Sequence, residues 1–273
     1  KIKGFVMCGI GGFLIQKRNS KQDKYLNTLK KMSFEQKERG PDNEGFWVDK
    51  NKDIFLFHRR LTILDLTSQG NQPMISQNKR YIISYNGEIY NFLTLATELK
   101  KIGINFKSKS DTEVILEAIS YWGVNKAVKK FIGMFAIAVW DKGKSQLFLI
   151  RDRLGIKPLY WGFIDNTYLF SSTIDSILSY TSEKREINNE ALKKYLNFGY
   201  VPSPYSIFKN IHKVKPGSIL KLEKNKEPLE RTYWDLNLNV SENKNKTNYN
   251  YDDCKIKLEK LIEDSISMRM ISD

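Results

Sequence analysis

Four short apolar segments lie close together in the middle of this chain, and their spacing limits the fold more than any other feature. Turn signals separate them, among them Asp141-Lys142-Gly143-Lys144 and Asp165-Asn166. Connections of this length are too short for a crossover helix, so the segments must pair as antiparallel hairpins. Two more strands precede them, the second ending in an Asn-Gly dipeptide that demands a turn. The expected strands cover residues 54–60, 80–87, 134–140, 146–151, 158–163 and 168–171.

Helical patterns lie before, between and after these strands. Ser110-Asp111-Thr112-Glu113 has the spacing of a capping box and opens an apolar helix that ends at Trp122. Helices and strands are grouped rather than strictly alternating, which indicates helical layers packed on antiparallel sheets. The helical patterns cover residues 22–37, 92–102, 111–122, 187–198 and 252–271.

The composition excludes several classes of protein. The chain of 273 residues is 41% hydrophobic and 12% aromatic, as expected of a globular protein with a substantial core. No apolar run approaches the roughly 20 residues that cross a bilayer, and no signal peptide is recognisable, so no membrane association is expected. Cys8 and Cys254 form no disulfide framework, which predicts a reducing, cytoplasmic location. The formal charge of +14 comes mainly from dispersed lysines, so we expect no nucleic-acid partner.

Cys8 stands between Met7 and the run Gly9-Ile10-Gly11-Gly12, where it can be a core residue, part of a phosphate-binding turn or a nucleophile. The run lacks the spacing of a phosphate loop, and no Cys/His cluster has the spacing of metal ligands. The two histidines, His58 and His212, give poor support for a Cys-His pair. If Met7 and the preceding residues are removed, Cys8 gains an α-amine whose pKa of about 7.7–8.0 suits a general base. Taken alone, a cysteine in a glycine-rich strand is more typical of a buried core residue than of a nucleophile.

Seven further stretches accompany MCGIGGF in a specific order and spacing. They are RGPDNEGFW (39–47), HRRLTILDL (58–66), GNQPM (70–74), YNGEIYNF (85–92), SDTEVIL (110–116), GMFAIAVWD (133–141) and RDRLGIKPLYW (151–161). Across about residues 7–235 the chain closely resembles the glutaminase domain of the glutamine-hydrolysing asparagine synthetases, which are class II, N-terminal-nucleophile amidotransferases. The resemblance implies an α+β fold, a four-layer αββα sandwich in which two antiparallel sheets lie between helical layers.

The resemblance also implies roles for individual residues. Cys8 would attack the side-chain amide of glutamine, while Asn86 and the backbone N–H of Gly87 would bind the oxyanion. Arg60 would hold the α-carboxylate of glutamine, a task suited to a guanidinium group. Glu88 and Asp111 would receive the α-ammonium group, and Asp111 can also serve the N-terminus of its own helix. The full set of expected glutamine-binding residues is Arg60, Leu61, Ile63, Glu88 and Asp111.

Two features depart from the family pattern. The residues KIKGFV precede Met7, so a free amine on Cys8 requires either a later start site or the processing of a short propeptide. The chain also lacks the Ser-Gly-Gly-x-Asp-Ser loop that binds ATP in the second domain of the family. The expected organisation is a glutaminase domain at 8–235, a linker at 236–251 and the start of a truncated synthetase domain at 252–273. The stretch Arg39-Gly40-Pro41-Asp42 is interpreted as a turn that supports the site, rather than as a contact residue of the site.

The expected function is glutamine hydrolysis that supplies ammonia for ATP-dependent amidation of aspartate in a domain beyond this chain. The glutaminase half should need no cofactor or metal, whereas ATP and Mg²⁺ belong to the missing domain. Two alternatives stay open: a different carboxylate acceptor, such as a surface polysaccharide or a metabolite, and a non-catalytic glutamine-binding module with an unprocessed N-terminus. The sequence also leaves open whether the protein forms a homodimer.

Overall fold

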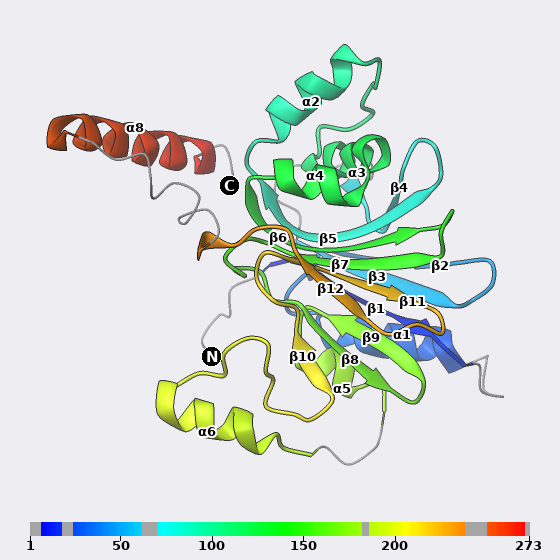
Figure 1. Ribbon diagram of the computed structural model, residues 1–273. Coiled ribbons are helices and arrows are strands. Elements are labelled where there is room, and N and C mark those ends of the chain that lie inside the picture. The colour runs from blue at the N-terminus through cyan, green and yellow to red at the C-terminus, as the bar shows by residue number, and fades with distance from the viewer. Residues whose placement is uncertain (1–6, 18–23, 62–69, 182–185, 238–249, 271–273) are drawn as a thin grey trace.

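Two six-stranded antiparallel sheets lie face to face at the centre of the molecule (Figure 1). The computed structural model describes residues 7–17, 24–61, 70–181, 186–237 and 250–270. Sheet A has the strand order β10-β8-β9-β1-β3-β2, and sheet B has the order β12-β11-β7-β6-β5-β4. In chain order the strands are β1 (Gly9–Ile15), β2 (Asn43–Val48), β3 (Ile54–Arg60), β4 (Met74–Ile75), β5 (Tyr81–Ile89), β6 (Gly133–Asp141), β7 (Gln146–Arg151), β8 (Tyr160–Ile164), β9 (Thr167–Ser171), β10 (Ile211–Lys213), β11 (Ser218–Glu223) and β12 (Leu229–Thr232).

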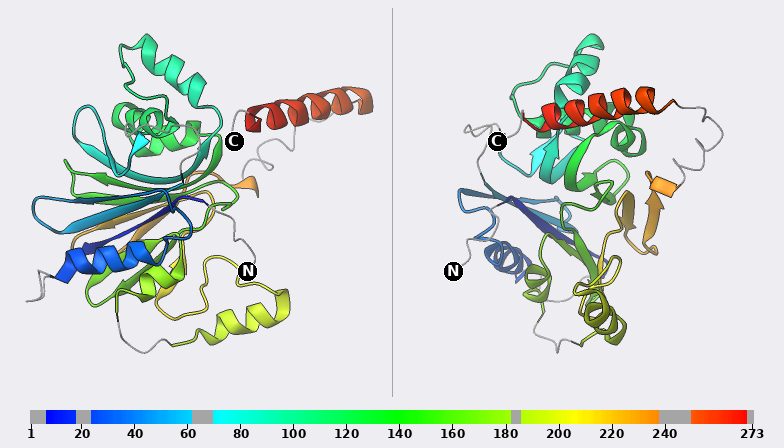
Figure 2. Two further views of the ribbon diagram at one scale, coloured as in Figure 1. Left: turned by 180° about the vertical axis from the view of Figure 1, so that it is seen from behind. Right: turned by 90° about the vertical axis from the view of Figure 1, so that its left-hand side faces the viewer.

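Helices cover the outer face of each sheet, which gives four layers (Figure 2). On sheet A lie α1 and α5, and on sheet B lie α2, α3 and α4. The expected αββα sandwich is therefore confirmed, and the hairpins β6-β7 and β8-β9 are antiparallel as the short connections require. The helices of these layers are α1 (Tyr25–Phe34), α2 (Phe92–Lys101), α3 (Asp111–Trp122), α4 (Val124–Lys130) and α5 (Ile174–Leu178).

The hydrophobic core has three parts, one between the two sheets and one between each sheet and its helices. Alternate residues of the central strands, such as Ile10 and Leu14 in β1 and Ala136 and Ala138 in β6, fill the space between the two sheets. The opposite faces of the strands pack against the helices, as Phe13 does against the α1 side of sheet A. Because side chains alternate, any polar residue in phase with Ile10 points into the gap between the sheets.

The glycines of β1 allow its neighbours to approach more closely than any side chain would permit. A Cβ atom on Gly12 would lie 2.0 Å from the carbonyl oxygen of Phe55, and one on Gly11 would lie 2.5 Å from the Phe57 ring. Gln36 packs over Gly9 and donates from Nε2 to the carbonyl of Ile10, at 3.2 Å. The glycine-rich run is thus a closely packed central strand, which holds Cys8 in a fixed position at its N-terminal end.

The Asn-Gly dipeptide of β5 does not form the turn that the sequence predicted. The strand continues through Asn86 and Gly87 to Ile89, and Gly87 pairs across the sheet with Phe135. A Cβ atom on Gly87 would lie 2.2 Å from the carbonyl oxygen of Met134, so glycine is required here by close backbone packing. The expectation was wrong because close approach to β6, rather than chain reversal, explains the glycine.

The capping box expected at α3 is only partly formed. Ser110 caps the helix by accepting from the N–H of Thr112 at 3.1 Å. The carboxylate of Glu113 instead accepts from the backbone N–H groups of Lys107 and Ser108, each within 3.0 Å. Glu113 therefore fixes the loop before α3 instead of returning to Ser110.

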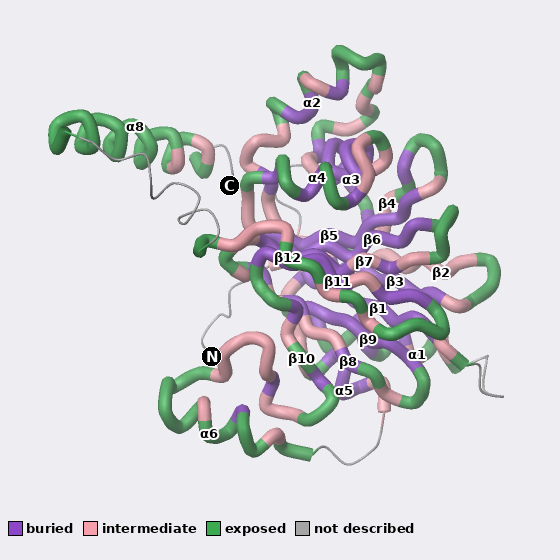
Figure 3. Tube along the Cα trace, viewed as in Figure 1, coloured by how far each residue is buried: buried purple, intermediate pink, exposed green. Residues whose placement is uncertain are grey.

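Two helices lie outside the four layers. The residues of α6 (Asn189–Phe198) are mostly exposed, and no residue of α8 (Tyr251–Arg269) is buried (Figure 3). The helix expected at 252–271 is thus present, whereas most of the linker expected at 236–251 lies outside the described residues. Within the described part of the chain, no helix is long and apolar enough to cross a membrane.

Replacing Gly12 by alanine should destabilise the protein, because the new methyl group would overlap the Phe55 carbonyl. We expect the free energy of unfolding to fall by about 1–3 kcal/mol, measured by guanidinium denaturation. Gly143→Ala serves as the control, because a Cβ atom there would meet side-chain atoms only, those of Arg80 at 3.2 Å and Asp141 at 3.3 Å, and no backbone atom within that distance. Equal stability of the two variants would contradict this role of Gly12.

Candidate active site

Three of the predicted site residues converge at one end of the gap between the sheets. Gly9 pairs with Arg59, so Cys8 and Arg60 occupy the next positions at the same end of two neighbouring strands. Both are in phase with residues that face sheet B, Cys8 with Ile10 and Arg60 with His58. On the opposite side, Asn86 is in phase with Ile82, which faces sheet A. The fold therefore brings together residues from separate parts of the sequence.

The thiol of Cys8 lies in a half-buried position against the backbone that follows β3. The N–H of Leu61 points at Sγ at 3.4 Å, and the carbonyl of Leu61 accepts from the thiol at 3.6 Å. Burial raises the pKa of the Cys8 thiol, while the Leu61 N–H and the positive charges of Arg60 and Lys157 oppose that rise. Leu61 thus contributes its backbone, and the site needs a base to form the thiolate.

Arg39 contacts the backbone on either side of Cys8. Its Nε donates to the carbonyl of Cys8 at 3.4 Å, and its own carbonyl accepts from the N–H of Met7 at 3.0 Å. These contacts are made with the backbone beside the thiol, so Arg39 supports the site, as expected of the turn at residues 39–42. A guanidinium group at the end of the turn fixes the chain next to the thiol.

Lys157 is a site residue to which sequence reasoning assigned no role. Its side chain is buried, its Nζ lies 3.1 Å from Sδ of Met7, and its charge acts on both Cys8 and Glu88. Burial lowers the pKa of Lys157, and the negative charge of Glu88 opposes this. The signal was present in the stretch RDRLGIKPLYW, where a lysine stands among apolar and turn residues.

Two buried charged residues build the loop that carries Lys157. The carboxylate of Asp152 accepts from the N–H groups of Ile156 and Lys157, both at 2.9 Å. The guanidinium of Arg151 donates to the carbonyls of Gly155 and Lys157, at 2.7 and 2.9 Å. Because these backbone groups are hydrogen-bonded to buried side chains, the loop holds Lys157 in one place.

Two hydrogen-bond donors of β5 are arranged for an anion. Asn86 is 2% exposed, and its Nδ2 has no hydrogen-bond partner among the described residues. The N–H groups of Tyr85 and Ile89 point to the β4 side of the strand, where they meet Gln72 at 2.6 Å and Asp111 at 3.2 Å. Gly87 lies between them in the same phase, so its N–H points to this side as well.

The short length of β4 keeps this edge of β5 open. β4 has two residues, which pair only with Ile82 and Ile83. On the other side, the N–H and carbonyl of Phe135 are bonded to Asp152, at 3.2 and 2.9 Å, so β6 does not occupy the N–H of its partner Gly87. A buried amide donor and a neighbouring backbone donor are the components of an oxyanion hole.

Asp111 and Glu88 supply negative charge beside these donors. Oδ2 of Asp111 accepts from the hydroxyl of Tyr85 at 2.7 Å and from the N–H of Ile89 at 3.2 Å. Burial raises the pKa of Asp111 to about 6, the hydrogen bonds of Tyr85 and Ile89 oppose the rise, and the charge of Glu88 adds to it. Asp111 is also the first residue of α3, so both roles considered for it are compatible with the geometry.

Comparison with known proteins identifies the family. Residues 7–234 match the profile of the glutamine amidotransferase domain. The chain belongs to this family. A putative glutamine-hydrolysing asparagine synthetase of Methanocaldococcus jannaschii is 37% identical, with 98% of this chain covering 53% of that protein. Asparagine synthetase 1 of Bacillus subtilis is 32% identical, with 98% of this chain covering 40% of it. The chain thus spans about half, or less, of these relatives.

Solved structures share the fold of this amidotransferase domain. The allosteric regulatory enzyme of purine biosynthesis aligns with a TM-score of 0.63 at 16% identity, covering 83% of this chain and 49% of that one. Glutamine phosphoribosylpyrophosphate amidotransferase of Bacillus subtilis aligns with a TM-score of 0.57 at 17% identity, with the same coverage. At this identity the alignments establish the shared fold alone, and residue roles must come from the site itself.

The structure does not place the two histidines in the site. His58 is 1% exposed and donates to the carbonyl of Tyr85 at 3.1 Å, and burial lowers its pKa to about 3, so it is a neutral structural residue. His212 lies on β10 beside the Trp161 ring, away from Cys8. Ile63 lies outside the described residues. No cluster of three or more His, Cys, Asp or Glu side chains within the described ranges could hold a metal ion.

Removing the Tyr85 hydroxyl should raise the pKa of Asp111 further above its usual range. The hydrogen bond from Tyr85 stabilises the ionised carboxylate, so Tyr85→Phe shifts the Asp111 titration from about pH 6 to a higher pH. Carbon-13 NMR of the carboxyl groups measures this shift directly. Tyr180→Phe is the matched control, because its hydroxyl bonds to Thr167 in sheet A. An unchanged Asp111 titration in Tyr85→Phe would show that this hydrogen bond does not set the pKa.

Proposed function

We propose that this chain hydrolyses glutamine, with Cys8 as the nucleophile, and releases ammonia. The observation that carries the proposal is the buried Nδ2 of Asn86, which has no partner among the described residues and lies beside the Gly87 N–H on the strand facing Cys8. A buried donor without a partner costs free energy in the resting protein. It is accounted for if an oxyanion forms there during the reaction.

The reaction proceeds through a thioester. With Met7 removed, the α-amine of Cys8 takes the thiol proton, and the thiolate attacks the side-chain carbonyl carbon of glutamine. Asn86 and Gly87 hold the oxyanion of the tetrahedral intermediate. The C–N bond then breaks as the α-ammonium returns the proton to the leaving nitrogen, and ammonia departs. A water molecule, deprotonated by the same amine, hydrolyses the γ-glutamyl thioester and regenerates the thiol with free glutamate.

The charges around the site support the recognition of an amino acid. Arg60 is proposed to bind the α-carboxylate of glutamine, and Glu88 and Asp111 to bind its α-ammonium. With a pKa of about 6, Asp111 is mostly ionised at neutral pH, as this role requires. Leu61 would contribute backbone contacts next to the thiol, and the expected contact of Ile63 stays a prediction. The positive charge of Lys157 would favour the thiolate.

The fate of the ammonia is proposed from the relatives. Two proteins named asparagine synthetases match 98% of this chain, which covers 53% and 40% of them. We therefore propose that the ammonia is used for the amidation of aspartate, with ATP and Mg²⁺ bound by a part that this chain does not contain. In this scheme residues 8–235 form the amidotransferase domain, 236–251 connect it, and 252–273 begin the synthetase part.

Asn86→Ala should lower kcat for glutamine hydrolysis by about 10²–10³-fold, with a much smaller effect on KM. The reason is that Asn86 would stabilise the transition state more than the bound substrate. The measurement is steady-state release of glutamate, with Cys8→Ala as the variant expected to have no turnover. Asn105→Ala is the control, because Asn105 is exposed in the loop before α3.

Other outcomes would reject specific parts of the proposal. Turnover of Cys8→Ala near that of the native protein would remove Cys8 as the nucleophile. A kcat of Asn86→Ala equal to that of Asn105→Ala would remove the oxyanion role. Binding of glutamine by the processed protein without any turnover would identify the chain as a binding module.

A further inference from the structure

A cavity of about 420 Å³ lies on the helix-bearing side of sheet B, separate from the site of Cys8. It is bounded by residues of β5, β6, β7, β11 and β12 and by the N-terminal end of α4. Its β5 residue, Tyr81, lies at the opposite end of that strand from Ile89 and points to the other face from Asn86. The proposed glutamine chemistry therefore leaves this cavity without a role.

The rim of the cavity carries positive charge. Lys126, Lys144, Lys221 and Arg231 line it from four different elements of the fold. Lys221 forms an ion pair with Glu223 at 2.6 Å. Among the described residues, the side chains of Lys126, Lys144 and Arg231 have no acidic partner. Three cations thus converge on one cavity without a carboxylate that neutralises them.

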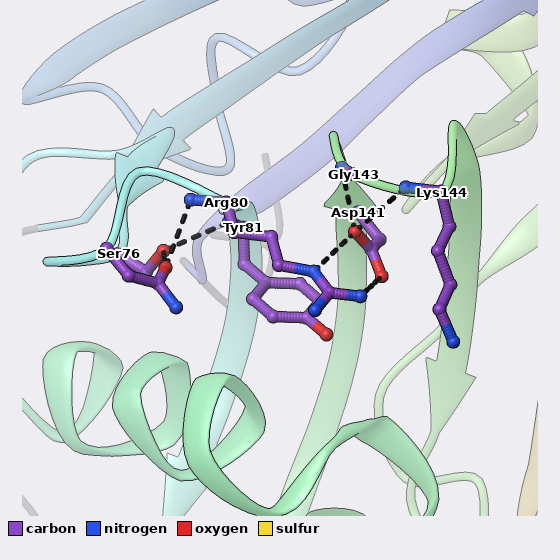
Figure 4. A network of polar contacts seen from close by, with 7 residues as sticks. Ser76, Arg80, Tyr81, Asp141, Gly143 and Lys144 are labelled. Carbon is purple, nitrogen blue, oxygen red and sulfur yellow. Dashed lines mark hydrogen bonds and ion pairs between the residues drawn. The ribbon is translucent and has the colours of Figure 1, made fainter.

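Among the described residues of the lining, the only acidic one is already occupied. Asp141 accepts a bidentate pair of hydrogen bonds from Arg80, at 2.9 and 2.7 Å. The same carboxylate accepts from the backbone N–H groups of Gly143 and Lys144, at 2.9 and 3.2 Å (Figure 4). This network fixes the turn between β6 and β7, so the backbone that carries Lys144 is placed before any ligand arrives.

The inner surface of the cavity is aromatic and aliphatic. The rings of Tyr81, Trp122 and Phe148 contribute to it, together with Ile219 and Leu229. Flat apolar walls below a cationic rim match a ligand that has a planar ring and an acidic group. A volume of about 420 Å³ lies in the range of small-molecule sites.

We propose that this cavity binds a planar organic anion, a heteroaromatic ring that carries phosphate, of the size of a nucleoside monophosphate. The ring contacts the aromatic wall, and the phosphate pairs with Lys126, Lys144 and Arg231. Because the cavity does not include Cys8, Arg60 or Asn86, ligand and glutamine can bind the same molecule together.

The test is isothermal titration calorimetry of the full chain with AMP, in the absence of glutamine. We expect saturable binding of one AMP per chain, and binding of adenosine or of inorganic phosphate that is weaker by about tenfold or more. The matched variants are Lys126→Glu and Lys129→Glu. Both residues are exposed on α4 and give the same change in net charge, but only Lys126 lines the cavity.

Lys126→Glu should weaken AMP binding by about tenfold or more, whereas Lys129→Glu should leave it unchanged. Arg231→Ala, on a different element, should weaken it as well. Equal weakening by the two α4 variants would show attraction by the overall charge of +14 and overturn the proposal. Phosphate binding as tight as that of AMP would overturn the role of the rings, and absence of AMP binding would overturn the site itself. None of these binding measurements depends on whether Cys8 hydrolyses glutamine.

Discussion

The close packing of β1 into the middle of sheet A is the constraint on which the rest of the site depends. At Gly11 and Gly12 the strand packs closely against Phe57 and the backbone of Phe55. These contacts occur in the β1–β3 register that pairs Gly9 with Arg59. A shift of one residue would turn Cys8 away from sheet B and would exchange the side chains that face sheet B with those that face the helices. The position of one thiol is therefore set by the packing of a whole strand.

A second constraint is the open edge of β5. Since β4 ends after two residues, the N–H groups of Tyr85, Gly87 and Ile89 are left without a strand partner. Gln72 and Asp111 bond to the outer two, and the N–H of Gly87 between them points to the same edge of the strand. An incomplete sheet edge is often a site of aggregation, whereas in the proposed mechanism it would supply a hydrogen-bond donor for the oxyanion.

Much of this arrangement could be predicted from the sequence, for identifiable reasons. The hairpins followed from turn lengths, and the convergence of Cys8, Arg60 and Asn86 followed from the resemblance of quoted motifs. The turn wrongly predicted at Asn86-Gly87 shows the limit of local patterns. Glycine is required at position 87 because the backbone of Met134, in a strand far along the chain, packs against it. Lys157 was missed for the same reason: the loop that carries it is held by long-range contacts, from Arg151 to Val214 and from Phe135 to Asp152. Such contacts leave no periodic signal in the sequence.

In the proposed mechanism the α-amine of Cys8 is the base for its own thiol, and two forms of the protein that differ only at the N-terminus test this role. Glutamine hydrolysis is measured for two forms of the protein whose N-termini are confirmed by intact mass: one begins at Cys8, and the other keeps Met7 attached by a peptide bond. The account predicts that the form beginning at Cys8 is faster by about 10²–10⁴-fold, the usual contribution of a general base. Equal turnover by the form that retains Met7 would contradict it, because the nitrogen of Cys8 would then be an amide without basicity.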